Sequence, residues 1–143
     1  MDEEGVVEAR LKLLAEYTND LRELQSVNLE EYQENKLVRK AVERTLHTAI
    51  EACLDIGHHI IAQEGFRSPE ENKDVFVVLG EEGVLSHTLA SRLVDMARFR
   101  NLLVHEYTHL DNTVVYGILK RRLSDFDEFA QAIAAYRLRP GQL

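Results

Sequence analysis

One short segment, RFRNLLVHEYTHLD, holds the densest set of chemically active side chains, and two incompatible patterns overlap in it. Arg100, His105 and Tyr107 form an Arg-x4-His-x-Tyr pattern, which suits metal-independent cleavage of RNA. His105, Glu106 and His109 form a His-Glu-x-x-His pattern, which suits a zinc hydrolase. Chance does not separate the two, because the composition predicts about 0.02 accidental copies of the first pattern and about 0.03 of the second.

The first pattern supplies groups that can cleave RNA through its own 2′-hydroxyl. That reaction needs a base near the hydroxyl, a proton donor for the leaving oxygen and a cation beside the crowded phosphorane. His105 can serve as base or acid, and the planar fork of Arg100 matches phosphate oxygens. Asn101 can position a phosphate or the histidine, and Tyr107 can stack on a base or donate a hydrogen bond to the phosphate. Arg98 is a further candidate for phosphate binding.

The second pattern needs more than the segment provides. Zinc cleavage requires both histidines on one face of a continuous helix, the glutamate beside a metal-bound water, and a third protein ligand. Asp111 can cap a new helix two residues after His109, where the helix of the motif should continue. Candidates for the third ligand are Asp125, Asp127 and Glu128. We therefore favour the first pattern and expect no metal site.

The spacing within the first pattern sets a geometric condition. Arg100 and His105 are five residues apart, which places them about 140° apart around an unbroken helix. Both can reach one phosphate only if the helix ends or tightens between them, or if a second copy of the chain supplies one of them.

Apolar residues recur every three or four positions along most of the chain, as one buried stripe of a helix requires. The first two stripes are Val7, Leu11, Leu14, Tyr17, Leu21 and Leu24, and then Val38, Val42, Leu46, Ile50, Cys53, Ile56 and Ile60. Gly65 is expected to end the second of these helices. The alternation with period two that would indicate a strand is not found in the sequence.

Capping signals divide the second half of the chain. The run Ser68-Pro69-Glu70-Glu71 predicts the start of a short helix that closes at Gly80. Ser86 can cap the next helix, and Asp111 can cap the last. Their apolar stripes are Leu89, Leu93, Met96 and Phe99, and then Val115, Ile118, Phe126, Phe129 and Ile133. We expect an all-α fold, a single domain over residues 1–143 built as an antiparallel bundle of four main helices plus a short one.

Length and charge limit the functions that are possible. A chain of 143 residues suits one domain, its single Cys53 excludes an internal disulfide, and no apolar run suggests membrane insertion or export, so we expect a cytoplasmic protein. The net charge is −8, but residues 1–34 carry ten acids against Arg10, Lys12 and Arg22. The acidic N-terminal segment, residues 1–35, therefore lies beside a nearly neutral body. This balance argues against wrapping long nucleic acid but permits a small nuclease site.

The segment RFRNLLVHEY resembles the signature of HEPN-domain ribonuclease toxins, in the HepT-like branch that is paired with a minimal nucleotidyltransferase antitoxin. The similarity extends over residues 41–107, which read AVERTLHTAIEACLDIGHHIIAQEGFRSPEENKDVFVVLGEEGVLSHTLASRLVDMARFRNLLVHEY. The following DNTVVYGILKRRLSDFDEFAQAI resembles the closing helix of that family. About two thirds of the chain is covered, and the order, spacing and flanking apolar positions agree.

The resemblance implies an all-helical homodimer with the active cleft between subunits, cleavage of cellular RNA (mRNA or tRNA) without a metal or other cofactor, and growth arrest when unrestrained. It assigns phosphate contact and transition-state support to Arg100, the central catalytic role to His105 and a second role to Tyr107. It also implies a type VII-like toxin–antitoxin pair, in which the antitoxin transfers AMP from ATP to Tyr107. Nucleotides attached there would fill the RNA cleft and add negative charge where the substrate phosphate must bind.

These residues also have structural explanations. The competing hypothesis for the motif is a surface turn in a noncatalytic helical dimerisation or binding module. His58-His59 with Cys53 could suggest a metal pair, but adjacent histidines point to different helix faces and Cys53 lies on the apolar stripe. Lys120-Arg121-Arg122 could contact RNA phosphates, although a solvated helix face is the expected role, and Arg92 is a weaker candidate.

Overall fold

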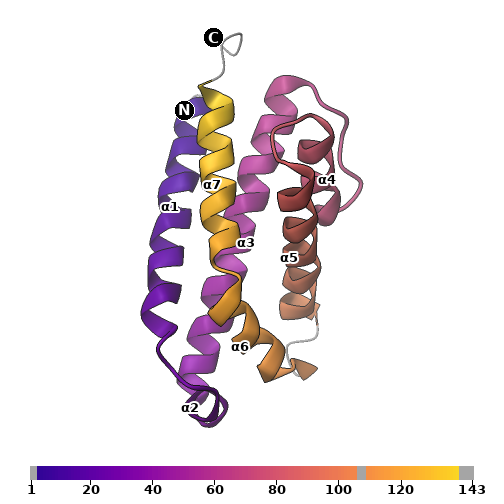
Figure 1. Cartoon of the computed structure of the whole chain (residues 1–143). Helices are drawn as coiled ribbons and strands as arrows, with labels where there is room; N and C mark the ends of the chain where they lie inside the picture. Colours follow the sequence, from indigo (N-terminus) through magenta and orange to yellow (C-terminus); the bar gives the residue numbers. More distant parts are fainter. Residues whose placement is uncertain (1–2, 106–108, 139–143) are drawn as a thin grey trace.

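The chain folds into a bundle of helices, and the computed structural model describes residues 3–105 and 109–138. Seven helices lie within those ranges (Figure 1). They are α1 (Glu3–Leu24), α2 (Leu29–Glu34), α3 (Lys36–Glu64), α4 (Asn72–Glu81), α5 (His87–His105), α6 (Asn112–Arg121) and α7 (Ser124–Arg137). The all-α prediction is confirmed, although the helices outnumber the four main ones and the short one expected.

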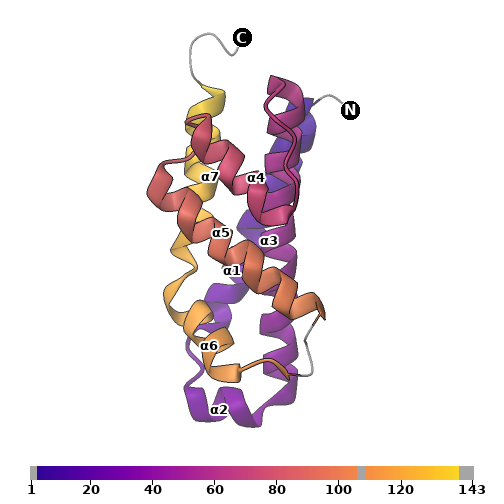
Figure 2. The ribbon, with the colours of Figure 1, turned by 90° about the vertical axis from the view of Figure 1, so that its right-hand side faces the viewer.

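The longest helix, α3, lies at the centre of the bundle. It contacts α1 on one side and α4 and α5 on another, and α7 lies beside it and runs in the same direction, whereas α1 and α5 run the opposite way (Figure 1). α2 and α6 contact each other at one end of the bundle, and the beginning of α1 and the end of α7 lie at the other (Figure 2). α3 therefore positions every other helix.

Local sequence sets both ends of α3. The side chain of Asn35 accepts a hydrogen bond from the backbone N–H of Val38 at 3.1 Å, which caps the start of the helix. At the other end Gly65 adopts a left-handed conformation with φ 70°, as predicted for a glycine that ends a helix. A second glycine, Gly57, lets α3 approach α4 closely, because a Cβ there would lie 2.4 Å from Cγ1 of Val75. The predicted extent of this helix is confirmed.

The apolar stripes predicted from the sequence form the core. In α1 the residues Val7, Leu14 and Leu21 are at most 2% exposed, whereas the flanking stripe positions are half-buried. Phe76 of α4 and Phe129 of α7 meet edge to face, with ring centroids 6.0 Å apart. The short helix α2 was not predicted; Asn28 caps its start, and its Tyr32 is fully buried.

The predicted start of the short helix is wrong. Ser68-Pro69 does not begin it; α4 begins at Asn72 after an extended Glu71. The cause is Asp74, whose carboxylate binds Arg67 at 2.8 Å and accepts the backbone N–H of Glu70 at 3.0 Å. Arg67 first, and then this backbone N–H, hold the pKa of Asp74 below its usual range. The predicted end at Gly80 lies one residue before the observed one.

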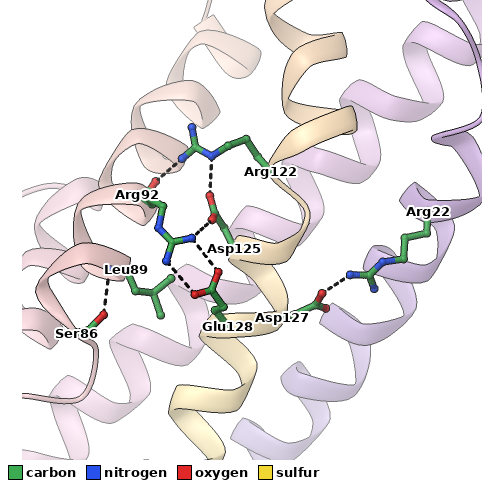
Figure 3. Close-up of polar contacts among 8 residues, drawn as sticks. All are labelled: Arg22, Ser86, Leu89, Arg92, Arg122, Asp125, Asp127 and Glu128. Carbon is green, nitrogen blue, oxygen red and sulfur yellow. Dashed lines mark hydrogen bonds and ion pairs between the residues drawn. The ribbon is translucent and has the colours of Figure 1, made fainter.

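The prediction of one continuous last helix is also wrong, because α6 ends at Arg121 and α7 begins at Ser124. Asp125, in the first turn of α7, is 1% exposed and binds Arg92 of α5 at 2.7 Å and Arg122 at 2.8 Å (Figure 3). Arg92 also binds Glu128 at 2.8 Å, and this contact holds the pKa of Glu128 below its usual value. The ion cluster of Arg92, Arg122, Asp125 and Glu128 thus fixes α5 to the junction of α6 and α7.

None of the helices in residues 3–105 and 109–138 has both the length and the apolar character needed to cross a membrane.

Replacing the buried carboxylate tests the importance of the ion cluster. We expect Asp125→Ala to lower the free energy of unfolding by about 2–4 kcal/mol, because both arginines lose a desolvated partner. Asp127→Ala is the matched control, since Asp127 lies on the same helix and binds Arg22 at an exposed position, and its cost should stay below about 1 kcal/mol. Urea titration followed by circular dichroism measures both. Equal losses for the two variants would show that the cluster has no special role.

Candidate active site

The residues of the Arg-x4-His-x-Tyr motif lie at the end of α5. Ser86 caps the start of this helix by accepting the backbone N–H of Leu89 at 3.1 Å, which confirms the predicted cap (Figure 3). The helix continues unbroken through Arg100 to His105, while Phe99 and Leu103 anchor it in the core. It neither ends nor tightens between Arg100 and His105, so the first of the two expected ways to bring them together is not used.

Three of the predicted site residues share one outward face of α5. Arg98, Asn101 and His105 are spaced three and four residues apart, the spacing of neighbours on one helix face. All three are exposed. Arg98 forms a long ion pair, 3.6 Å, with Asp95 one turn earlier. This face therefore presents a cation, an amide and an imidazole to solvent in one row, which we call the α5 face.

Arg100 points towards α3 instead. Its side chain is 21% exposed, and its Nε donates to Oε1 of Glu51 at 2.5 Å. Nη1 of the same guanidinium donates to Oδ1 of Asn101 at 3.2 Å. Asn101 therefore links Arg100 to the α5 face, one helical turn before His105. The structure brings Arg100 and Asn101 into direct contact.

Glu51 and His47 are neighbours of the motif that sequence reasoning missed. Nε2 of His47 lies 3.4 Å from Oε1 of Glu51, the oxygen that Arg100 binds. His47 and Glu51 are one turn apart on α3, and this four-residue spacing was the only feature of the sequence that indicated the pair. The signal is weak, because a histidine and a glutamate four residues apart are common on solvated helices.

The remaining motif residue, Tyr107, lies outside the described residues, as does Glu106. Beyond them, Asp111 caps α6 by accepting the backbone N–H of Thr113 at 2.9 Å, as predicted. His109 belongs to neither α5 nor α6. The two histidines of the zinc pattern therefore do not share one described helix.

The proposed third zinc ligands are engaged elsewhere. Asp125 and Glu128 bind Arg92, and Asp127 binds Arg22. Within residues 3–105 and 109–138, no three potential metal-binding side chains are grouped closely enough to hold an ion. The geometry gives no support to the zinc pattern.

Other candidate residues have structural roles. Arg92 and Arg122 belong to the ion cluster, and Lys120 donates to the backbone oxygen of Gln25 at 2.5 Å. The basic run at residues 120–122 is therefore largely engaged in packing α6 against its neighbours. Cys53 is buried in the core, and desolvation raises the pKa of its thiol, which disfavours the reactive thiolate.

A small apolar cavity of about 150 Å³ lies where α5 gives way to α6. It is lined by Phe99, Leu102, His109, Leu110, Asp111, Val114 and Val115. Two of these residues are unusually exposed for their type, Leu102 at 45% and Val114 at 50%. Apolar surface therefore borders the motif.

Comparison with known proteins gives consistent results. A family model for HepT-like ribonucleases matches residues 14–133. The tRNA nuclease HepT of Aphanizomenon flos-aquae is 27% identical over 131 residues, which cover 92% of this chain and 89% of that protein. The mRNA nuclease HepT of Shewanella oneidensis is 29% identical over 105 residues, which cover 73% of this chain and 79% of that protein.

The fold also matches solved structures. A tri-AMPylated HEPN toxin of Shewanella oneidensis, in complex with an MNT antitoxin, superimposes with a TM-score of 0.85 at 23% identity. The match covers 94% of this chain and 99% of that one. At this level of identity the likeness establishes a shared fold.

Proposed function

Because this chain belongs to the HepT-like ribonuclease family, we propose that it is a metal-independent endoribonuclease and the toxin of a type VII-like toxin–antitoxin pair. The resemblance noted in the sequence is confirmed by the family match. That match over residues 14–133 is the single observation that carries the proposal. Two similar proteins are named as nucleases of tRNA and of mRNA, so we propose cellular RNA of either class as the substrate of this chain.

The residues of the motif suit this reaction in distinct ways. His105, exposed at the end of α5, is proposed to take the proton from the attacking 2′-hydroxyl or to give one to the leaving oxygen. Arg100 is proposed to stabilise the charge that develops on the phosphorane. Asn101 and Arg98 are proposed to bind phosphates beside them. Tyr107 is proposed to contact the base or the phosphate.

A second copy of the chain is proposed to complete the site. The continuous α5 turns Arg100 towards α3 and His105 towards solvent. The helix of one subunit therefore does not bring both side chains to the same phosphate. The exposed Leu102 and Val114 offer apolar surface next to the motif for the contact between copies. We therefore propose a homodimer of single-domain subunits, each spanning residues 1–143, with Arg100 of one facing His105 of the other.

We propose that AMP transfer to Tyr107, which the family resemblance implies, controls the site. This residue stands two positions after His105, so nucleotides attached to it would lie beside the catalytic imidazole and repel substrate phosphate. The similar Shewanella oneidensis toxin is AMPylated and bound to an MNT antitoxin. We propose a cognate minimal nucleotidyltransferase as the partner of this chain. We also propose a cytoplasmic location, where RNA and ATP are both abundant.

Substitution of the motif should separate catalysis from simple binding. We expect His105→Ala and Arg100→Ala each to lower kcat for RNA cleavage about 100-fold or more, with circular dichroism spectra unchanged. His109→Ala is the control, because His109 lies outside α5, and its kcat should stay within about twofold of the parent. Cleavage of labelled total RNA, with and without EDTA, measures all of these. Full cleavage by His105→Ala would defeat the assignment of His105. No cleavage by the parent protein would favour a noncatalytic binding module, and loss of cleavage in EDTA would revive the zinc hypothesis.

Mixing two inactive variants tests whether the site is shared. A heterodimer of Arg100→Ala with His105→Ala keeps one intact pair, Arg100 from one subunit and His105 from its partner. We expect such heterodimers, purified with two different tags, to recover up to about half of the parent activity. A site contained in one subunit would leave every pair incomplete, and the mixture would stay inactive.

Intact-mass measurement tests the control by AMP. The reading frame beside this gene is expected to encode a small nucleotidyltransferase. Chain co-expressed with that protein should gain the mass of one or more AMP units and lose RNA cleavage. Tyr107→Phe should keep the unmodified mass. A mass gain that persists in Tyr107→Phe would place the modification on another residue.

A further inference from the structure

The Arg100 guanidinium is held from another helix. Glu51 stands in the middle of α3, and its Oε1 accepts the Nε–H of Arg100 at 2.5 Å. Asn101 accepts from Nη1 at 3.2 Å. A long side chain on a helix surface ordinarily samples many rotamers, and ordering it costs conformational entropy. Two acceptors on two different nitrogens remove much of that freedom before any substrate arrives.

These contacts leave the phosphate-binding end of Arg100 available. A guanidinium carries five N–H groups. Glu51 occupies the one on Nε, and Asn101 occupies one of the two on Nη1. In the part of the chain that the structure describes, donors therefore remain on both terminal nitrogens, which is where a bidentate contact with two phosphate oxygens is made. Glu51 binds the Nε side of the guanidinium and does not occupy its two terminal nitrogens.

Glu51 is itself braced. His47, one turn earlier on α3, places Nε2 3.4 Å from the same Oε1. The side chains of His47 and Glu51 are 24% and 36% exposed, so both are partly enclosed by neighbouring helices. The contacts from His47 through Glu51 to Arg100 thus connect α3 to the motif.

We propose that Glu51 is a positioning residue for the ribonuclease reaction, fixing Arg100 in the orientation that stabilises the phosphorane, with His47 bracing it. This inference rests on the proposed function. The negative charge of Glu51 has a specific consequence for phosphate binding by Arg100. A carboxylate beside Arg100 offsets its positive charge, so Glu51 does not strengthen the attraction between Arg100 and ground-state phosphate. Its contribution comes from preorganisation, which acts on kcat and not on KM.

Steady-state cleavage of a labelled RNA by variants of the full chain tests the proposal. We expect Glu51→Ala to lower kcat about 10- to 100-fold with no rise in KM. Glu51→Gln keeps an oxygen that can accept from Nε, so its kcat should lie between those of Glu51→Ala and the parent. The matched control is Asp55→Ala, which removes another α3 carboxylate that pairs with an arginine, Arg10 of α1 at 3.6 Å. That variant should keep kcat within about twofold of the parent.

A double-variant cycle separates positioning from general stability. If Glu51 acts through Arg100, then Glu51→Ala should lower kcat little further when Arg100 is already alanine. Melting temperatures of Glu51→Gln and Asp55→Ala should lie within about 5 °C of the parent, so that a folding defect cannot mimic the effect.

The possible failures are distinct. Parent-level or higher kcat in folded Glu51→Gln and Glu51→Ala, or a full additional loss on the Arg100→Ala background, would overturn the role of Glu51 alone. If the parent cleaves no RNA, the proposed function itself is overturned. If Arg100→Ala cleaves RNA fully, the catalytic role of Arg100 is overturned, and with it the positioning role of Glu51.

Discussion

Two arginines of one helix fix α5 to its neighbours, and the placement of Arg98, Asn101 and His105 depends on these contacts. Arg92 reaches the almost fully buried carboxylate of Asp125 at the start of α7, and Arg100 reaches Glu51 on α3. These contacts lie about two turns apart along α5, so the helix is fixed both in position and in rotation about its axis. A rotation of α5 would break both ion pairs and turn the α5 face away from its present direction.

Local chemistry made much of this fold predictable. The caps at Ser86 and Asp111 and the left-handed Gly65 depend on residues close in sequence, and each was predicted correctly. The errors arose where distant residues overruled local signals. Ser68-Pro69 suggests a helix start, but Arg67 and Asp74 draw the chain into a different turn. The apolar positions of α6 and α7 read in the sequence as the stripe of one helix. Only the ion pairs of Asp125 with Arg92 and Arg122 reveal the break between the two helices.

The candidate site likewise has features that local sequence predicts and features that only distant contacts determine. The spacing of Arg98, Asn101 and His105 is enough to place them on one helix face, and the structure agrees. The partner of Arg100 is 49 residues away in the sequence, so no local pattern could have identified Glu51. Within one chain the continuous α5 turns Arg100 and His105 to different sides, as their five-residue spacing predicts. Sequence motifs therefore name the candidate residues, while the bundle determines how they are presented.

The beginning of α1 and the end of α7 lie at one end of the bundle, and the end of α5 and the whole of α6 lie towards the other (Figure 1). A domain fused ahead of α1 or beyond α7 would therefore extend away from Arg98, Asn101 and His105. Fluorescent reporters or affinity handles attached at either position would leave the α5 face uncovered. The same polarity makes this scaffold suitable for tethering the chain to a surface with its motif directed outward.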